Sequence, residues 1–323
     1  MMKRITLKFY FTFFLLLMVL ISCEKKTVPE AAILVNKRVL FLGNSITNQG
    51  GYVSYIEYYL RKQFPADRID IISIGLSSET VSCLSELAHP FPRPCLRERL
   101  ERALQKIKPD IVVACYGMND GIYHPQSPDR MERFREGIHH LLQQINGVGA
   151  KAILMSPPVF DPLPLAERVV DDGATDFSYL HPYENYDSVL GDYSEWLQSL
   201  NDADIRVIDV HGPMKAQIMT LRSQNPSFSY STDGIHPSAS GHLFIAQQFL
   251  KSFGYTFDQD IKTLADSVES DNLFQLVDAR RKLRSEGWLK FVGYIRKDTV
   301  KQDHIDDIEM EVARLDREIS TKK

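Results

Sequence analysis

The sequence predicts an α/β protein, a three-layer α/β/α sandwich built on a central parallel sheet of about five strands. From residue 37 onward, short runs rich in β-branched residues alternate with longer amphipathic segments, which is the pattern of a parallel sheet flanked by helices. The short runs are almost uninterrupted apolar sequence, as expected for strands that helices cover on both faces. The composition of the 323 residues, 44% hydrophobic and 25% charged, excludes the fibrous and disordered classes.

The alternation assigns each element to a stretch of the chain. Strands are expected at residues 38–42, 70–74, 110–116, 151–155 and 205–210. Helices are expected at residues 52–63, 96–107, 128–145, 183–200 and 239–253. Residues 157–182 are rich in Pro and Asp and lack a clear period, so they are predicted to form a long surface loop, where functional residues concentrate.

The sequence after the last of these helices changes character. Residues 37–254 are expected to form the α/β domain, and residues 255–323 a helical C-terminal extension. In the extension, apolar residues recur at spacings of three and four at Ile305, Ile308, Val312, Leu315 and Ile319. Two heptads are marginal as an isolated coiled coil, so packing onto the α/β domain is favoured over oligomerisation.

The N-terminus has the organisation of an export signal. Lys3, Arg4 and Lys8 precede an uncharged apolar run at residues 9–22, which is shorter than the roughly 20 residues that span a bilayer. Residues 20–23, Leu-Ile-Ser-Cys, resemble a bacterial lipobox, in which the cysteine is acylated. The sequence therefore predicts a signal peptide at residues 1–22, a lipid on Cys23, a tether at residues 23–36 and a protein anchored in the bacterial cell envelope, periplasmic or on the surface. The alternative is a signal peptide that ends elsewhere, with Cys23 incidental.

The charge balance bears on the class of partner. The net charge is −4, and removal of residues 1–22 leaves 35 basic against 42 acidic residues, or −7. Such a balance does not favour a nucleic-acid partner.

Three cysteines remain after Cys23. Cys115 lies in an apolar run and is predicted to be a buried strand residue. Cys83 and Cys95 flank a Pro-rich stretch, and in an oxidising compartment they could form a disulfide. The sequence leaves both states of this pair open.

A serine follows the first predicted strand. Residues 39–47 read Val-Leu-Phe-Leu-Gly-Asn-Ser-Ile-Thr, which places Ser45 at a strand-to-helix turn. Ligands of open α/β sheets bind beyond the carboxyl ends of the strands, so this hydroxyl is expected to face the functional crevice. The chain has no dinucleotide fingerprint or phosphate loop at this turn, and no Gly-x-Ser-x-Gly elbow.

Two further motifs provide partners for this serine. Asp233 and His236 lie three residues apart just before the last helix of the domain. A serine needs a base to become nucleophilic, and a carboxylate orients the imidazole and stabilises its protonated form. Asn119, at the end of the third strand, has a side-chain amide that can stabilise a developing oxyanion. Each motif alone also suits an ordinary turn or helix cap, so the weight lies in their coincidence.

Together these motifs resemble those of the SGNH hydrolases, the flavodoxin-like superfamily that includes the GDSL esterases and lipases. The matching blocks are Gly43-Asn44-Ser45-Ile46, residues 71–75, Gly117-Met118-Asn119-Asp120 and Asp233-x-x-His236. The resemblance implies that Ser45 is the nucleophile, that His236 is the base oriented by Asp233, and that the oxyanion is bound by the Ser45 N–H, the Gly75 N–H and the Asn119 amide. Asn44 stands where the family usually has Asp, and Ser73 and Ser78 depart from the second block, which makes Gly75 the weakest match.

The resemblance also implies the reaction and a substrate class. It implies ester hydrolysis with no cofactor and no metal, and the sequence has no His-Glu-x-x-His motif. The chain looks most like bacterial esterases that remove short acyl groups, especially O-acetyl groups, from carbohydrate. Tyr123, His124 and Arg93 are the positions expected to contact substrate. Two alternatives remain: a lipase or lysophospholipase, and a non-catalytic carbohydrate-binding or envelope scaffold on the same fold.

Overall fold

The computed structural model describes residues 30–201 and 204–322, and it contains the expected parallel sheet. Five strands lie in the order β2-β1-β3-β4-β5, and every neighbouring pair is parallel. The strands are β1 (Arg38–Gly43), β2 (Asp70–Ser73), β3 (Ile111–Cys115), β4 (Lys151–Met155) and β5 (Ile205–Ile208). The prediction of a three-layer α/β/α sandwich is confirmed, and all five predicted strands form at or within a few residues of the expected positions.

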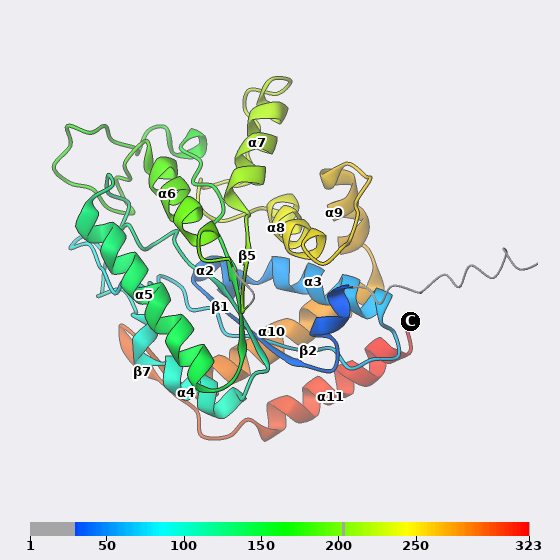
Figure 1. Ribbon diagram of the computed structural model, residues 1–323. Helices are drawn as coiled ribbons and strands as arrows, with labels where there is room; N and C mark the ends of the chain where they lie inside the picture. Colours follow the sequence, from blue (N-terminus) through cyan, green and yellow to red (C-terminus); the bar gives the residue numbers. More distant parts are fainter. Residues whose placement is uncertain (1–29, 202–203, 323) are drawn as a thin grey trace, which may run out of the picture.

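Helices cover both faces of this sheet (Figure 1). One group, α4, α5 and α6, lies on one side of the strands, and α3 and α8 lie on the other. The helices of the domain are α2 (Ser45–Gln49), α3 (Gly51–Gln63), α4 (Leu100–Ile107), α5 (Pro128–Gly147), α6 (Tyr186–Gln198), α7 (His211–Arg222) and α8 (Ala239–Lys251). The aromatic rings of Phe41 in β1, Tyr52 in α3 and Phe249 in α8 pack together with centroids about 6 Å apart. The core therefore lies between the sheet and both helical layers, which explains the uninterrupted apolar runs.

Two α-helices and one hairpin of the described residues were not predicted. The short helix α2 follows β1 directly. Helix α7 begins at His211 and has Gly212 and Pro213 in its first turn, a pair that is typical of turns, although proline is tolerated in the first turn of a helix. The strands β6 (Tyr294–Arg296) and β7 (Asp298–Val300) form a two-stranded hairpin in the extension. The predicted helix at residues 96–107 is divided into a 3₁₀ turn, Leu96–Glu98, and α4.

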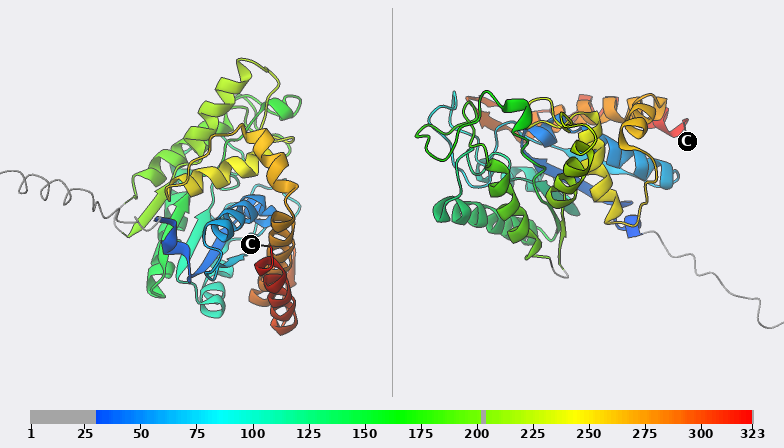
Figure 2. Two further views of the ribbon diagram at one scale, coloured as in Figure 1. Left: turned by 90° about the vertical axis from the view of Figure 1, so that its right-hand side faces the viewer. Right: turned by 90° about the horizontal axis from the view of Figure 1, so that it is seen from above.

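The C-terminal extension packs back onto the domain. It contains α9 (Ile261–Glu269), α10 (Asn272–Val292) and α11 (Asp306–Ser320). Helices α10 and α11 lie side by side (Figure 2), and α10 also contacts α3 and the edge strand β2. Val312, Leu315 and Ile319 of the predicted apolar stripe are buried. Helix α10 thereby covers a sheet edge that would otherwise present unpaired backbone groups.

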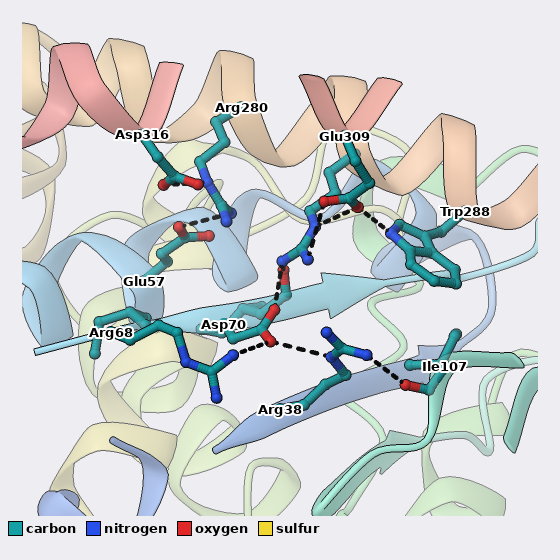
Figure 3. Close-up of polar contacts among 12 residues, drawn as sticks. Arg38, Glu57, Arg68, Asp70, Ile107, Arg280, Trp288, Glu309 and Asp316 are labelled. Atoms are coloured by element: carbon teal, nitrogen blue, oxygen red, sulfur yellow. Dashed lines mark hydrogen bonds and ion pairs between the residues drawn. The ribbon is translucent and has the colours of Figure 1, made fainter. Parts of the chain in front are cut away.

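A network of charged side chains joins the extension to the sheet (Figure 3). At its centre is Asp70, the first residue of β2, whose carboxylate accepts from Arg38 at 3.0 Å, Arg68 at 2.7 Å and Arg284 of α10 at 2.7 Å. Arg284 also donates to the backbone carbonyl of Ile71. Burial alone would raise the pKa of Asp70, but Arg284 and Arg38 outweigh it and lower that pKa.

A second group of charges in the same network binds α10 and α11 to α3. Arg280 of α10 contacts Glu57 of α3 at 3.0 Å and Asp316 of α11 at 2.7 Å. Glu57 also accepts from Arg61 on the same helix. The arginines and carboxylates therefore alternate across the contact between the extension and the domain.

Two predictions about the N-terminus lie outside the described residues. These are the signal peptide at residues 1–22 and the lipid on Cys23, so both stay predictions, as does anchoring in the cell envelope. None of the helices in the described part of the chain combines the length and the apolar character required to cross a bilayer.

Candidate active site

Ser45 lies at the start of α2, directly beyond the carboxyl end of β1. The side chain of Asn44 accepts from the Ile46 N–H at 3.1 Å and caps this short helix. A Cβ on Gly43 would lie 2.1 Å from Oγ1 of Thr47 and 2.8 Å from the carbonyl oxygen of Cys115, so only glycine fits there. The turn is therefore tight, and it leaves Ser45 partly exposed between buried neighbours.

The structure brings Ser45, His236 and Asp233 into one hydrogen-bonded row. Nε2 of His236 lies 2.8 Å from Oγ of Ser45, and Nδ1 lies 2.7 Å from Oδ2 of Asp233. Because an ionised carboxylate can only accept, Nδ1 carries the imidazole proton and Nε2 is free to accept from the serine hydroxyl. This is the arrangement that activates a serine for nucleophilic attack.

The loop between Tyr230 and α8 holds the acidic member of the row. Oδ1 of Asp233 accepts from the N–H groups of Ile235 at 3.0 Å and His236 at 2.7 Å, and from the Ser231 hydroxyl at 3.0 Å. Burial would raise the pKa of Asp233, but the hydrogen bonds from His236 and from the loop N–H groups hold that pKa well below its usual range. Asp233 therefore stays ionised across the neutral range. No role was predicted for Ser231 from the sequence, although a serine two residues before Asp233 is typical of a Ser turn.

The two remaining predicted oxyanion donors lie on the adjacent loops. A Cβ on Gly75 would lie 2.3 Å from the backbone nitrogen of Asn48 in α2, so this loop packs directly on the helix that begins with Ser45. The side chain of Asn48 donates to the Gly75 carbonyl at 2.9 Å. Asn119 is buried, and its Nδ2 donates to the backbone carbonyl of Glu79 at 3.2 Å. The loops of Gly75 and Asn119 are thus joined to each other and to α2.

Asp120 clamps these two loops together. Its Oδ1 accepts from the N–H groups of Val81 at 2.7 Å and Ser82 at 2.9 Å, and its Oδ2 accepts from the Gly117 N–H at 2.8 Å. The side chain is fully buried. Burial raises the pKa of Asp120 to about 6, although the three N–H groups oppose the shift. Asp120 belongs to the Gly117–Asp120 motif, but its position in that motif did not predict this role.

This raised pKa predicts how stability depends on pH. The folded protein binds the Asp120 proton more tightly than the unfolded chain does, because the Asp120 carboxyl has the ordinary pKa of 3.8 in the unfolded chain. Binding of this proton therefore stabilises the folded protein fully below pH 4. The stabilisation is lost as the pH rises through 6, and above that pH the stability no longer changes through Asp120. We expect the unfolding free energy of the wild type relative to Asp120→Asn to fall by about 2–3 kcal/mol between pH 4 and 7. Urea unfolding of both proteins at a series of pH values measures this, and a difference that does not vary with pH contradicts it.

Two of the three expected substrate contacts are directed inward instead. The Arg93 guanidinium is buried and donates through two nitrogens to Glu86, each at 2.6 Å. Tyr123 is also buried, and its hydroxyl donates to Oδ1 of Asn119 at 3.1 Å. Their polar atoms are therefore engaged within the protein, which corrects the expectation of substrate contact for both. His124 is half-buried, with its ring against that of Phe177.

The cysteine pair left open by the sequence is joined in the structure. Cys83 and Cys95 form a disulfide, with Cα atoms 4.6 Å apart. It closes the Pro-rich loop that contains Glu86 and Arg93. Cys115 is free and buried in β3, as predicted. In the described residues, no group of three or more His, Cys, Asp and Glu side chains is arranged to hold a metal ion.

Known proteins share both the sequence pattern and the fold. A model of the GDSL-like lipase/acylhydrolase family matches residues 41–243. An acetylxylan esterase from Geobacillus stearothermophilus is 23% identical over 234 residues, which cover 68% of this chain and 94% of that protein.

Two solved structures have the same fold at low sequence identity. The structure of a catalytic mutant of an acetylxylan esterase from Geobacillus stearothermophilus aligns with a TM-score of 0.51 at 19% identity, covering 70% of this chain and 97% of that one. The structure of a gut microbial diltiazem-metabolizing enzyme aligns with a TM-score of 0.52 at 22% identity, covering 68% of this chain. The chain spans only about half of that enzyme, 47%. The family model matches more than half of the residues of this chain, and we therefore conclude that the chain belongs to the GDSL-like lipase/acylhydrolase family and is a carboxylic-ester hydrolase.

Proposed function

We propose that the protein is a serine esterase that removes O-acetyl groups from carbohydrate. The observation that carries the proposal is the row formed by Ser45, His236 and Asp233, with contacts of 2.8 and 2.7 Å. The similarity to an acetylxylan esterase over 94% of that protein supports acetylated carbohydrate as the substrate class.

The mechanism follows from the proton positions in this row. His236 Nε2 accepts the proton of the Ser45 hydroxyl as its oxygen attacks the acetyl carbon, and Asp233 stabilises the imidazolium that results. The negative charge on the former carbonyl oxygen is stabilised by the Ser45 and Gly75 N–H groups and by the Asn119 amide. His236 then donates its proton to the leaving sugar oxygen as the ester bond breaks. In the second half-reaction His236 accepts a proton from water as the water oxygen attacks the acetyl carbon, and His236 then donates this proton to the Ser45 oxygen as acetate leaves.

The surroundings of Ser45 favour a hydroxylated substrate. The exposed side chain of Asn48 accepts from the Ser77 hydroxyl at 3.2 Å, next to the Gly75 loop. The next residue along this loop, Ser78, has its hydroxyl 3.2 Å from Nε2 of His89. A lipase needs a broad apolar surface for the acyl chain, whereas these groups offer hydrogen bonds to sugar hydroxyls.

Acyl-chain length separates the proposal from the lipase alternative. We expect kcat/KM on aryl esters to fall at least tenfold from acetate to octanoate, and we expect release of acetate from acetylated xylo-oligosaccharides. A preference for octanoate would favour a lipase, and the absence of hydrolysis of every ester by folded protein would favour the non-catalytic scaffold.

A further inference from the structure

The side-chain amide of Asn119 can perform its proposed role in only one of two orientations. A rotation of 180° about its last bond exchanges Oδ1 and Nδ2 with almost no change in shape. With Nδ2 toward the substrate, the amide donates to the oxyanion. With Oδ1 there, it would repel the same charge. Whatever fixes the amide therefore affects the rate.

Two contacts define the orientation of this amide. The Glu79 carbonyl, which can only accept, receives a hydrogen bond from Nδ2 at 3.2 Å. The Tyr123 hydroxyl donates to Oδ1 at 3.1 Å. We propose that Tyr123 is a positioning residue for the esterase reaction, which holds the Asn119 amide with its free N–H directed at the oxyanion. The inference rests on the role proposed above for Asn119.

The ring of Tyr123 is held in place from more than one side. The guanidinium carbon of Arg93 lies 5.5 Å from its centroid, and the ring of Tyr186 lies 5.0 Å away. Arg93 is itself fixed by its two bonds to Glu86. The phenol hydroxyl therefore has little freedom to move away from Asn119. In this proposal, buried Arg93 fixes the Tyr123 ring, and Tyr123 in turn fixes the Asn119 amide.

The backbone adopts an unfavourable conformation to bring Tyr123 to this position. Ile122 and Tyr123 have φ values of 48° and 62°, in the left-handed region that β-branched and bulky residues avoid. The Ile122 N–H donates to the Asn119 carbonyl, and the Tyr123 carbonyl accepts from the Tyr183 N–H at 2.9 Å. These bonds fold the segment back so that a side chain four residues after Asn119 reaches its amide. Strain of this kind persists where the surroundings fix it, and it concentrates at functional sites.

The phenol remains a donor under all working conditions. Burial raises the pKa of Tyr123 to about 12, although the charge of Arg93 opposes the shift. The hydroxyl therefore keeps its proton across the neutral range. Because the hydroxyl can donate to Oδ1 at any working pH, the ratio of kcat between wild type and Tyr123→Phe should not change with pH across the neutral range.

The test is a double-mutant cycle with Asn119. Tyr123→Phe removes only the hydroxyl, so we expect kcat on an aryl acetate to fall about 3- to 10-fold, the usual effect of one neutral hydrogen bond. KM should remain within twofold, because the oxyanion forms only in the transition state. Asn119→Ala should lower kcat about 10²- to 10³-fold. In the Asn119→Ala background, Tyr123→Phe should have no further effect, because its target is gone.

Tyr193→Phe is the matched control. Tyr193 is another buried tyrosine, near Gly121, and its hydroxyl has no hydrogen-bond partner among the residues that the structure describes. Its replacement should leave kcat within twofold. Thermal unfolding of every variant separates loss of folded protein from loss of rate.

The outcomes distinguish the two levels of the argument. An unchanged kcat in Tyr123→Phe, or equal losses with and without Asn119, would overturn the role of Tyr123 alone. Full activity in Asn119→Ala would instead overturn the proposed oxyanion site, and with it the basis of this inference. A loss confined to the background that contains Asn119 supports the proposal.

Discussion

Replacing Ser45 with alanine is expected to lower kcat/KM on an aryl acetate by about 10⁴-fold or more while the protein remains folded. The Ser45 oxygen is the nucleophile of the proposed mechanism, and it lies 2.8 Å from Nε2 of His236, the proposed base. Its removal leaves the Asn44 cap of α2 intact. Steady-state hydrolysis measures the loss, and mass spectrometry after treatment with a fluorophosphonate should find the wild type labelled once, on Ser45.

Ser188→Ala is the matched control for this variant. Ser188 is exposed on α6, where its hydroxyl donates to the carbonyl of Asn185. It should retain full activity and full labelling. Activity of Ser45→Ala within tenfold of the wild type, or fluorophosphonate labelling that persists in it, would show that Ser45 is not the nucleophile.

The largest effect on stability is expected from Glu79→Gln, at about 3–5 kcal/mol of unfolding free energy. The Glu79 and Arg99 side chains are both 0% exposed and share two hydrogen bonds of 2.6 Å. Glu79 also accepts from the Tyr116 hydroxyl at 2.6 Å. Glutamine keeps the shape but leaves the Arg99 charge buried without a counter-ion. Urea unfolding at pH 7 measures the change.

A second substitution tests the physical cause. In Glu79→Gln/Arg99→Met, the buried charge is absent, so the double variant should be more stable than Glu79→Gln alone. Glu286→Gln breaks an exposed pair with Lys290 on α10 and should leave the unfolding midpoint nearly unchanged. If Glu79→Gln costs less than about 1 kcal/mol, the pair is not an important source of stability.

The elements that follow from local pattern could be predicted from the sequence. Strands buried on both faces are mostly apolar, so the predicted ends of β1 and β3 differ from the observed ends by at most one residue. Ser45 and His236 could be selected because parallel strands and their loops gather residues at one sheet edge. The structure places these two side chains in contact.

The features that depend on long-range packing could not be predicted. Arg93 and Tyr123 were expected to contact substrate, but the left-handed conformation of Ile122 and Tyr123 and the bonds of Arg93 to Glu86 direct both side chains inward. Charged residues are almost always solvated, so nothing in the local sequence indicates that Glu79 pairs with Arg99 in the interior. Each of these side chains is placed by a partner that is distant along the chain or by the backbone conformation of a turn.

The network around Asp70 bears on how the chain holds itself together. Asp70 begins the strand whose far end leads to Gly75, and one of its three arginine partners belongs to α10. A shortened protein that stopped at residue 254 would lose that guanidinium and its contact with the Ile71 carbonyl. It would also uncover the outer edge of the sheet, at β2, beside the Gly75 loop. The C-terminal extension therefore stabilises β2, the strand that leads to this loop, and we expect the α/β domain to depend on it for stability.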